Sequence, residues 1–460
     1  MAKKQKYDYD LIVLGSGGGG SVAALIAAGA GKRVAMIEAD VMGGECPNYG
    51  CVPTKSLLYA AGIYDAAKHG QQFGIRSTTL TYNYPSLKAW KDLAVDRTGA
   101  TEGKRLYESE GIKVIEGEAR FISRNEITVN RHHLSADTFL IATGTHNFIP
   151  PIEGLEKTGY ITFKEAVNLT RPPKSLFVIG AGSIGCEFAE LFSIFGTKVH
   201  LSDITPRILS KEDEAVSELV RETFEDDRGM NVLTNTKVLR VAKEGLAKRV
   251  YYQQGASEKS IKVDEILVAT GKLANVDIGL ENAGVEYTPR GINVNDHMQT
   301  TAKNIYAAGD VVGPYNYTHT AIYQSRVAAN NILHKQKIAV DYRAVPRAVF
   351  LNPEIASVGL TEDECLKRDV RIRKAVAPIA IIGRANTSNV DKGFVKVITD
   401  PSGILIGASI VSPRAGEMIH ELTLAIQMRL TAQDVASTIH AFPTWSEAVR
   451  IACSKVAKSS

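Results

Sequence analysis

The sequence has few cysteines, no long apolar run and almost no net charge, and each shortage excludes a class of protein. Only 5 of the 460 residues are cysteine, and so sparse and odd a number does not fit the disulfide framework of a small secreted protein. No stretch approaches the roughly 18 consecutive apolar residues of a membrane-spanning helix. The formal charge is only +4 and no long basic block is present, so nucleic-acid binding is not indicated.

The first ten residues and the chain length set two further expectations. The opening MAKKQKYDYD is charged and polar, and no apolar segment of a secretion signal follows it. We therefore expect a cytoplasmic protein. A chain of 460 residues is too long for one hydrophobic core, so two to four domains are expected.

One pattern occurs twice along the chain: a strand, a glycine-rich turn, a helix, a second strand and an acid. The turns Gly15–Gly20 and Gly180–Gly185 both fit G-x-G-x-x-G, and the second strands end at Glu38 and Asp203. Twenty-three residues separate the first glycine from the acid in each copy. One such turn is a weak signal, but two copies in the same context predict two Rossmann-like dinucleotide-binding modules.

Each part of this pattern has a physical role. The first glycine makes a tight turn, the second lets the backbone approach a pyrophosphate, and the third lets helix and strand pack closely. The helix N-terminus attracts the phosphates, and the acid accepts hydrogen bonds from a ribose. The candidate cofactor-binding glycines are Gly15, Gly17, Gly20, Gly180, Gly182 and Gly185.

Two later segments support the duplication. Asp137–Gly144 and Asp264–Gly271 are apolar strands that both end in Ala-Thr-Gly, and a further strand ends at Asp310. Gly144 and Gly271 therefore join the candidate cofactor-binding residues. The order predicts an α/β protein in which one Rossmann-like domain is inserted into another, followed by an α+β domain. The expected bounds are 1–150 with 275–345, then 151–274, then 346–460.

The segment Gly43–Lys55 follows the first module directly and contains two cysteines. Cys46 and Cys51 are five positions apart, a spacing that allows a disulfide if the segment is a distorted helix start. A helix N-terminus there would lower the pKa of a thiol and favour the thiolate. Zinc is a poor alternative because no second pair of ligands completes the site; two buried cysteines are the other alternative.

Gly43–Lys55 resembles the redox-active signature G-G-T-C-x-N-x-G-C-x-P-[ST]-K of the class I pyridine nucleotide–disulfide oxidoreductases, and the resemblance covers essentially the whole chain. That family includes dihydrolipoamide dehydrogenase, glutathione reductase, mercuric reductase and soluble transhydrogenase. The resemblance implies FAD in the first module, a nicotinamide dinucleotide in the second and a dimerisation domain after them. It also implies a redox-active disulfide between Cys46 and Cys51, and a homodimer whose subunits share the active site.

The resemblance assigns further roles. Glu38 and Asp310 would bind FAD, Cys51 would face the flavin, and Cys46 would meet the substrate. Lys55 would lie near flavin N5, paired with Glu187, because a fixed cation stabilises the negative reduced flavin.

The acid of the second module bears on the choice of nicotinamide cofactor. Asp203 favours NADH over NADPH, since a carboxylate accepts from a free 2′-hydroxyl and repels a 2′-phosphate. Arg207 lies close enough in sequence to leave NADPH open.

The segment His440–Glu447 departs from the family. Members that exchange disulfides end in H-x-H-P-T-x-x-E, where the histidine before Pro-Thr comes from the partner subunit and acts as acid and base, oriented by the glutamate. Here Phe442 occupies that position and cannot transfer a proton, so Glu447, still a candidate catalytic residue, loses its usual partner. His440 could substitute only after local rearrangement.

Glu45 is a second departure, since threonine is usual beside the first cysteine. A carboxylate there should oppose thiolate formation, unless it is solvated and inert.

Three hypotheses follow. The leading one is an NADH-dependent FAD oxidoreductase that reduces a quinone, a metal ion or another small electrophile instead of a lipoyl disulfide; no resident metal is expected. The first alternative is a dihydrolipoamide dehydrogenase in which His440 or water supplies the proton. The second alternative, a flavin-binding redox sensor without turnover, is disfavoured by the complete second module.

Overall fold

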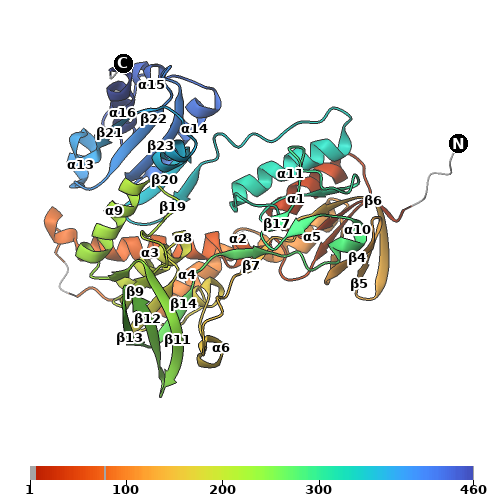
Figure 1. The fold of residues 1–460 in the computed structure, drawn as a ribbon, viewed down its shortest axis with the longest axis horizontal. Helices are drawn as coiled ribbons and strands as arrows, with labels where there is room; N and C mark the ends of the chain where they lie inside the picture. The colour runs from red at the N-terminus through yellow and green to blue at the C-terminus, as the bar shows by residue number, and fades with distance from the viewer. Residues whose placement is uncertain (1–6, 77–78, 459–460) are drawn as a thin grey trace. The chain divides into compact units, whose positions relative to one another are not determined.

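The computed structural model describes residues 7–76 and 79–458, and the chain divides into two units (Figure 1). The first unit comprises Met1–Ser56, Ser86–Phe148 and Gly271–Val340. The second unit comprises Leu57–Pro85, Ile149–Thr270 and Asp341–Ser460. No helix in the described ranges has the length and apolar character needed to cross a membrane.

The first unit is built on a mainly parallel sheet, and the first glycine turn follows the carboxyl end of one of its central strands. Strand β1 (Tyr9–Leu14) lies between β2 (Val34–Glu38) and β6 (His132–Ile141). All three run parallel. The outer neighbours are also parallel: β3 (Lys113–Glu116) beside β2, and β18 (Ile305–Ala307) beside β6. Because β18 follows the inserted segment in sequence, the predicted insertion of one α/β domain into another is confirmed.

Both faces of this sheet are buried, as its nearly continuous apolar strands predict. Leu11 and Val13 of β1 face one apolar cluster, and Ile12 and Leu14 face another. Helices α1 (Gly18–Gly29) and α11 (Thr318–Leu333) lie side by side in Figure 1. The backbone N–H of Ala23 donates to Ser325 Oγ at 3.0 Å, so small residues on α1 bring the two helices close together.

The second unit contains another parallel sheet in the order β10-β9-β8-β14, and an antiparallel one in the order β19-β20-β23-β22-β21. The parallel strands are β8 (Ser175–Ile179), β9 (Lys198–Ser202), β10 (Asn231–Leu233) and β14 (Glu265–Val268). The antiparallel strands are β19 (Arg347–Val349), β20 (Glu354–Gly359), β21 (Arg373–Pro378), β22 (Phe394–Thr399) and β23 (Leu405–Ser412). Helix α8 (Ser183–Ile194) follows β8, while α14 (Ala415–Gln427) and α16 (Glu447–Lys458) pack their apolar sides on the antiparallel sheet.

The remaining helices are α2 (Glu45–Asn48), α3 (Cys51–Lys68), α4 (Tyr84–Asp96), α5 (Gly103–Ser109), α6 (Leu155–Thr158), α7 (Phe163–Ala166), α9 (Glu214–Glu222), α10 (Leu280–Ala283), α12 (Glu362–Lys367), α13 (Gly383–Ser388) and α15 (Ala432–Ser437). The remaining strands are β4 (Ala119–Ser123), β5 (Glu126–Val129), β7 (Thr145–Asn147), β11 (Thr236–Glu244), β12 (Ala247–Gln254), β13 (Ser257–Val263), β15 (Lys272–Ala274), β16 (Tyr287–Thr288) and β17 (Gly291–Ile292). Among these strands, β4 and β5 extend the sheet of the first unit beyond β6, and the others form the smaller sheets β11-β12-β13, β15-β7 and β16-β17.

A buried charge network lies in the second unit, around Glu190 of α8. Arg228 donates to Asp65 Oδ1 at 2.8 Å and to Glu190 Oε1 at 3.3 Å, and the backbone N–H of Asn352 donates to Glu190 Oε2 at 2.9 Å. Burial raises the pKa of Glu190 to about 7, although Arg228 opposes the shift. Ionisation of Glu190 therefore destabilises the folded state.

Glu190→Gln is expected to change how stability depends on pH. The pKa of Glu190 in the folded state lies above its ordinary value. The contribution of Glu190 to the free energy of unfolding is therefore complete below about pH 4.5 and is lost as pH rises through about 7. The wild type should therefore lose about 2 kcal/mol relative to the glutamine variant between pH 5 and 7.5. Melting temperatures of both proteins at the two pH values measure this loss, and a constant difference would contradict it.

Candidate functional site

The two glycine turns have nearly identical backbone geometry. Gly15 and Gly180 have φ of 105° and 104°, a region that favours glycine. A Cβ added to Gly20 would lie 2.0 Å from the carbonyl oxygen of Gly15. A Cβ added to Gly185 would lie 1.9 Å from the carbonyl oxygen of Gly180. The third glycine of each turn therefore has no room for a side chain, which is the packing role that the pattern predicts.

The acids at the ends of β2 and β9 close the turns in the same way. Glu38 Oε2 accepts from the backbone N–H of Ser16 at 2.9 Å. Asp203 Oδ2 accepts from the backbone N–H of Ala181, the matching residue, at 2.7 Å. Each carboxylate thus lies beside its glycine turn, where the sugar next to a bound pyrophosphate would lie.

The N-termini of α1 and α8 fit anionic groups. Their N-cap residues, Gly17 and Gly182, are both extended with ψ of −174°, and no side chain in the described ranges caps either helix. Neither first turn contains an acidic residue. The backbone N–H groups of each first turn therefore remain suited to a phosphate, and the residues fit one dinucleotide per module.

The two Ala-Thr-Gly segments lead into paired strands. Gly144 and Gly271 have φ of 65° and 111°, so both turn the chain in a conformation that favours glycine. Strands β7 and β15, which begin at the next residues, pair antiparallel, with Lys272 opposite Asn147. Their predicted contact with a cofactor stays a prediction.

The cysteine segment forms the distorted helix start that its sequence predicts. Cys46 lies in the short helix α2, and Cys51 is the first residue of α3. The two sulfurs are present as thiols, not as a disulfide. They are hydrogen-bonded to each other. Cys51 Sγ also lies 3.6 Å from the hydroxyl of Thr318, the first residue of α11. The site therefore holds the dithiol form of the predicted redox pair, at the N-terminal ends of two long helices.

The prediction that the helix start lowers a thiol pKa is wrong for Cys46 in this dithiol form. The hydrogen bond with Cys51 and burial both raise the pKa of the Cys46 thiol, whereas the Thr318 hydroxyl lowers it. A proton shared between two sulfurs is harder to remove, so the effect of the helix ends is outweighed.

Glu45 is paired and partly buried, with 32% of its side chain exposed, and its predicted effect on the thiolate stays a prediction. Its carboxylate forms an ion pair with Lys272, at the start of β15. The charges of both residues act on Asp310: burial raises the pKa of Asp310, Lys272 lowers it, and Glu45 raises it. An ammonium group thus compensates the unusual carboxylate beside Cys46.

Lys272→Met is expected to slow alkylation of Cys46 by iodoacetamide in the reduced protein, by up to about tenfold near neutral pH. The unpaired Glu45 carboxylate would then disfavour the thiolate that reacts. The double variant Lys272→Met with Glu45→Thr removes both charges and should recover the original rate. Equal rates in the wild type and the single variant would contradict this role.

Lys55 and Glu187 belong to different units, the first to α3 and the second to α8. Glu187 is buried, and its Oε1 accepts from the backbone N–H of Phe350 at 3.0 Å. Their predicted pairing stays a prediction.

The segment before α16 shows what replaces the expected histidine. Phe442 is 75% exposed. Glu447 Oε2 is buried and has no hydrogen-bond partner among the residues described. The His440 ring makes one hydrogen bond, between Nδ1 and the carbonyl of Thr438 at 2.8 Å, while Nε2 lies 2.8 Å from Glu421 Oε1 without hydrogen-bond geometry. His440 is therefore fixed elsewhere, and Glu447 keeps an unused acceptor.

Sequence reasoning missed Thr318 and Lys272 near the thiols and Asp363 near the second module. Lys272 directly follows the second Ala-Thr-Gly, and Thr318 opens the motif THTA, so both had a local signal. Asp363 had none. Within residues 7–76 and 79–458, no group of three or more His, Cys, Asp or Glu side chains is placed to hold a metal ion.

Comparison with known protein families gives two matches that together span most of the chain. Residues 9–325 match the family described as pyridine nucleotide-disulphide oxidoreductase, and residues 345–453 match the dimerisation domain of that family.

Individual relatives carry different names. A mercuric reductase of Staphylococcus aureus is 35% identical over 97% of this chain and 82% of its own length. A dihydrolipoyl dehydrogenase of Geobacillus stearothermophilus is 37% identical over 95% of this chain and 94% of its own length. The Cu(II) complex of an HOCl-induced flavoprotein disulfide reductase, RclA of Escherichia coli, has a similar structure. Its TM-score is 0.87 at 28% identity, covering 98% of this chain and 100% of that one.

Proposed function

The chain belongs to the pyridine nucleotide-disulphide oxidoreductase family of enzymes, and we propose that it oxidises NADH and reduces a small acceptor other than a lipoyl disulfide. A metal ion is the acceptor we favour, with quinones and other small electrophiles as further candidates. The observation that carries this choice is Phe442, which stands in the position of the acid–base histidine, while Glu447 Oε2 is buried without a hydrogen-bond partner among the residues described.

Members of this family use FAD with NAD(P)H, and the dimerisation domain supports a homodimer. We assign FAD to residues 1–150 with 275–345, the nicotinamide dinucleotide to 151–274, and dimerisation to 346–460. FAD, when bound, supplies a two-electron relay between NADH and the thiol pair. The fit of both glycine turns to a pyrophosphate supports these assignments.

The thiol pair would store the electrons. In the balanced step, one disulfide, one NADH and one proton give two thiols and one NAD⁺. Cys51, beside Thr318, would take the flavin side and Cys46 the acceptor side. Lys55 with Glu187 would place a positive charge beside the reduced flavin.

The choice of acceptor follows from Phe442, which stands where a proton-transferring residue would serve the thiols. Exchange with a disulfide substrate needs a group that moves a proton to the leaving thiolate, and phenylalanine cannot supply it. Reduction of a metal ion by a dithiol forms no new S–H bond on the acceptor, so that group is dispensable. The names of two similar proteins, a mercuric reductase and a reductase in complex with Cu(II), support the same class of acceptor.

NADH is the favoured cofactor because Asp203 lies at the sugar end of the second module with its carboxylate beside Ala181. The loop after β9 carries two cations, Arg207 and Lys211. Arg207, the one nearer to Asp203 in sequence, is paired with Asp363 and Glu214, so a 2′-phosphate would meet the Asp203 carboxylate while the Arg207 charge is already matched.

A dihydrolipoamide dehydrogenase is the second candidate, supported by the 37% identical relative of that name. It would require His440 to leave Thr438 and Glu421, or water to move the proton. The names of the relatives, reductase and dehydrogenase, favour either enzyme over a flavin-binding sensor.

Steady-state assays of the FAD-loaded dimer test the proposal. With NADH as donor, Hg(II), Cu(II) or a quinone should be reduced with a higher kcat/KM than lipoamide. Lipoamide as the best acceptor would overturn the proposal in favour of the second candidate.

A further inference from the structure

The loop after β9 holds Arg207 next to the second glycine turn. Thr205 donates its backbone N–H to Asp203 Oδ1 at 2.8 Å, and its hydroxyl lies 2.9 Å from the carbonyl of Arg207. The backbone N–H of Leu209 then donates to the carbonyl of Ala181 at 2.8 Å. Since Asp203 is also bonded to Ala181, both ends of the loop are fixed to the same residue of the turn. The Arg207 side chain therefore starts at the sugar end of the nucleotide site.

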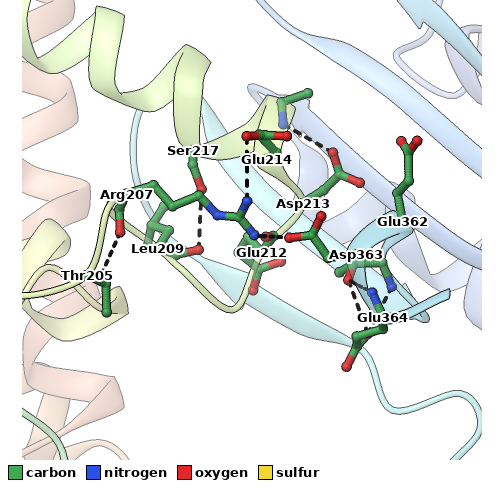
Figure 2. Close-up of polar contacts among 12 residues, drawn as sticks. Thr205, Arg207, Leu209, Glu212, Asp213, Glu214, Ser217, Glu362, Asp363 and Glu364 are labelled. Atoms are coloured by element: carbon green, nitrogen blue, oxygen red, sulfur yellow. Dashed lines mark hydrogen bonds and ion pairs between the residues drawn. The ribbon is translucent and has the colours of Figure 1, made fainter. Parts of the chain in front are cut away.

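Figure 2 shows that this side chain points toward two acids. Its guanidinium forms a hydrogen-bonded ion pair with Asp363, in the first turn of α12. Nη1 lies 3.8 Å from Glu214 Oε1, at the start of α9. Asp363 is the closer and less exposed partner, with 33% of its side chain exposed against 66% for Glu214. Arg207 is thus held mainly by a residue 156 positions away in sequence.

Three other acids near Arg207, namely Glu212, Asp213 and Glu362, have basic partners of their own. Arg347 Nε lies 3.0 Å from Glu212 Oε1. Lys396 Nζ, almost fully buried, lies 2.8 Å from Asp213 Oδ2 and 2.6 Å from Glu362 Oε2. These acids are therefore already matched, and removing the Asp363 charge would leave no neighbouring acid as close to take its place.

We propose that Asp363 is a positioning residue for cofactor selection, which excludes 2′-phosphorylated dinucleotides by holding Arg207 away from the sugar end of the second module. This inference rests on the proposed binding of NADH there. An arginine near the acid of such a module can accommodate a 2′-phosphate, because guanidinium–phosphate hydrogen bonds are strong and directional. Here Arg207 has the right origin for that contact, but its guanidinium is taken up by a carboxylate.

Asp363→Asn keeps the shape of the side chain and removes its charge. Calorimetric titration of the FAD-loaded dimer should then show binding of adenosine 2′,5′-bisphosphate tightened by about tenfold, with ADP changed by less than about twofold. The kcat/KM for NADPH should rise by a similar factor while that for NADH stays nearly constant. Glu214→Gln should give a smaller gain, since Glu214 is farther away and more exposed. Equal changes for both ligands, or none, would overturn the proposal.

The double variant Asp363→Asn with Arg207→Met is the matched control, and it should lose the gain. A gain that survives it would show that Arg207 is not the released group, which overturns the proposal. The single variant Arg207→Met, in which Asp363 is kept, should leave binding of adenosine 2′,5′-bisphosphate unaltered. In the wild type the Arg207 guanidinium is held by Asp363 and contributes nothing to that binding. A loss of more than about threefold would show that Arg207 reaches the 2′-phosphate in the wild type.

The proposed function and the proposed role of Asp363 are tested by different measurements. Failure of NADH to reduce either the bound flavin or the Cys46–Cys51 pair in the wild type contradicts the proposed function, whatever Asp363 does. The binding titrations use nucleotides that carry no electrons, so they report only on the sugar end of the second module.

Discussion

Phe442→His is expected to raise NADH-dependent reduction of lipoamide by about a hundredfold, because positioned general acid–base catalysis contributes roughly 10²–10⁴-fold. The imidazole would stand directly before Pro443-Thr444, where disulfide-exchanging relatives carry theirs. Glu447 Oε2, buried and without a partner among the described residues, could then accept from the new ring. Metal-ion reduction should change little, since it does not use that proton.

The local packing allows this replacement. The Phe442 ring lies over Gly383, where an added Cβ would be 3.0 Å from ring carbons, and an imidazole is smaller than the benzyl ring. Phe442→Tyr offers a ring without a suitable base and should give no gain. Phe442→His with Glu447→Gln should give only part of the gain. If Phe442→His leaves lipoamide reduction within about threefold of the wild type, histidine is not the missing element and the argument for the acceptor fails.

Cys46→Ser is expected to lower turnover with the preferred acceptor by more than about a hundredfold while NADH still bleaches the bound flavin. A hydroxyl cannot form the disulfide, so the electrons have no path to the acceptor side. Rapid-mixing kinetics of flavin reduction, compared with steady-state turnover, separates the two steps.

Cys453→Ala is the matched control for Cys46→Ser, because Cys453 lies on the buried side of α16, in the apolar core. It should keep both flavin reduction and turnover. If Cys46→Ser retains turnover within about threefold of the wild type, the pair only tunes the flavin.

The parts of the fold that local chemistry dictates were predictable from the sequence. The glycine turns and their acids follow from backbone sterics over a few residues, and strand β9 ends at Ser202, directly before the predicted acid Asp203. The predicted turn Gly15–Gly20 is shorter than expected, because α1 begins at Gly18. Glycine is a poor helix former, yet here Gly18–Gly20 build the first turn because no side chain fits there: a Cβ on Gly19 would lie 2.6 Å from the Ala308 carbonyl oxygen.

Contacts between distant segments were not predictable. Lys272 meets Glu45 across 227 residues, and Thr318 meets Cys51 across 267. Lys272 and Thr318 have local sequence signals, but no local pattern identifies their distant partners, so only the folded chain shows that the Glu45 carboxylate is compensated and that a hydroxyl reaches the thiols. The pairing of Arg207 with Asp363, across 156 residues, is of the same kind, and it changes the meaning of an arginine that the sequence alone left ambiguous.

The claim that the Cys46–Cys51 pair receives the electrons of NADH is tested most directly by an anaerobic titration of the oxidised FAD-loaded dimer. One equivalent of NADH should leave the flavin largely oxidised and produce a long-wavelength absorbance band, from a Cys51 thiolate beside the flavin ring. The same addition to Cys51→Ser should produce no such band. The account would be contradicted if NADH bleached the wild-type flavin directly and no long-wavelength band formed. Cys46 and Cys51 would then remain unreactive toward a thiol reagent at the end point, because their disulfide had not been reduced.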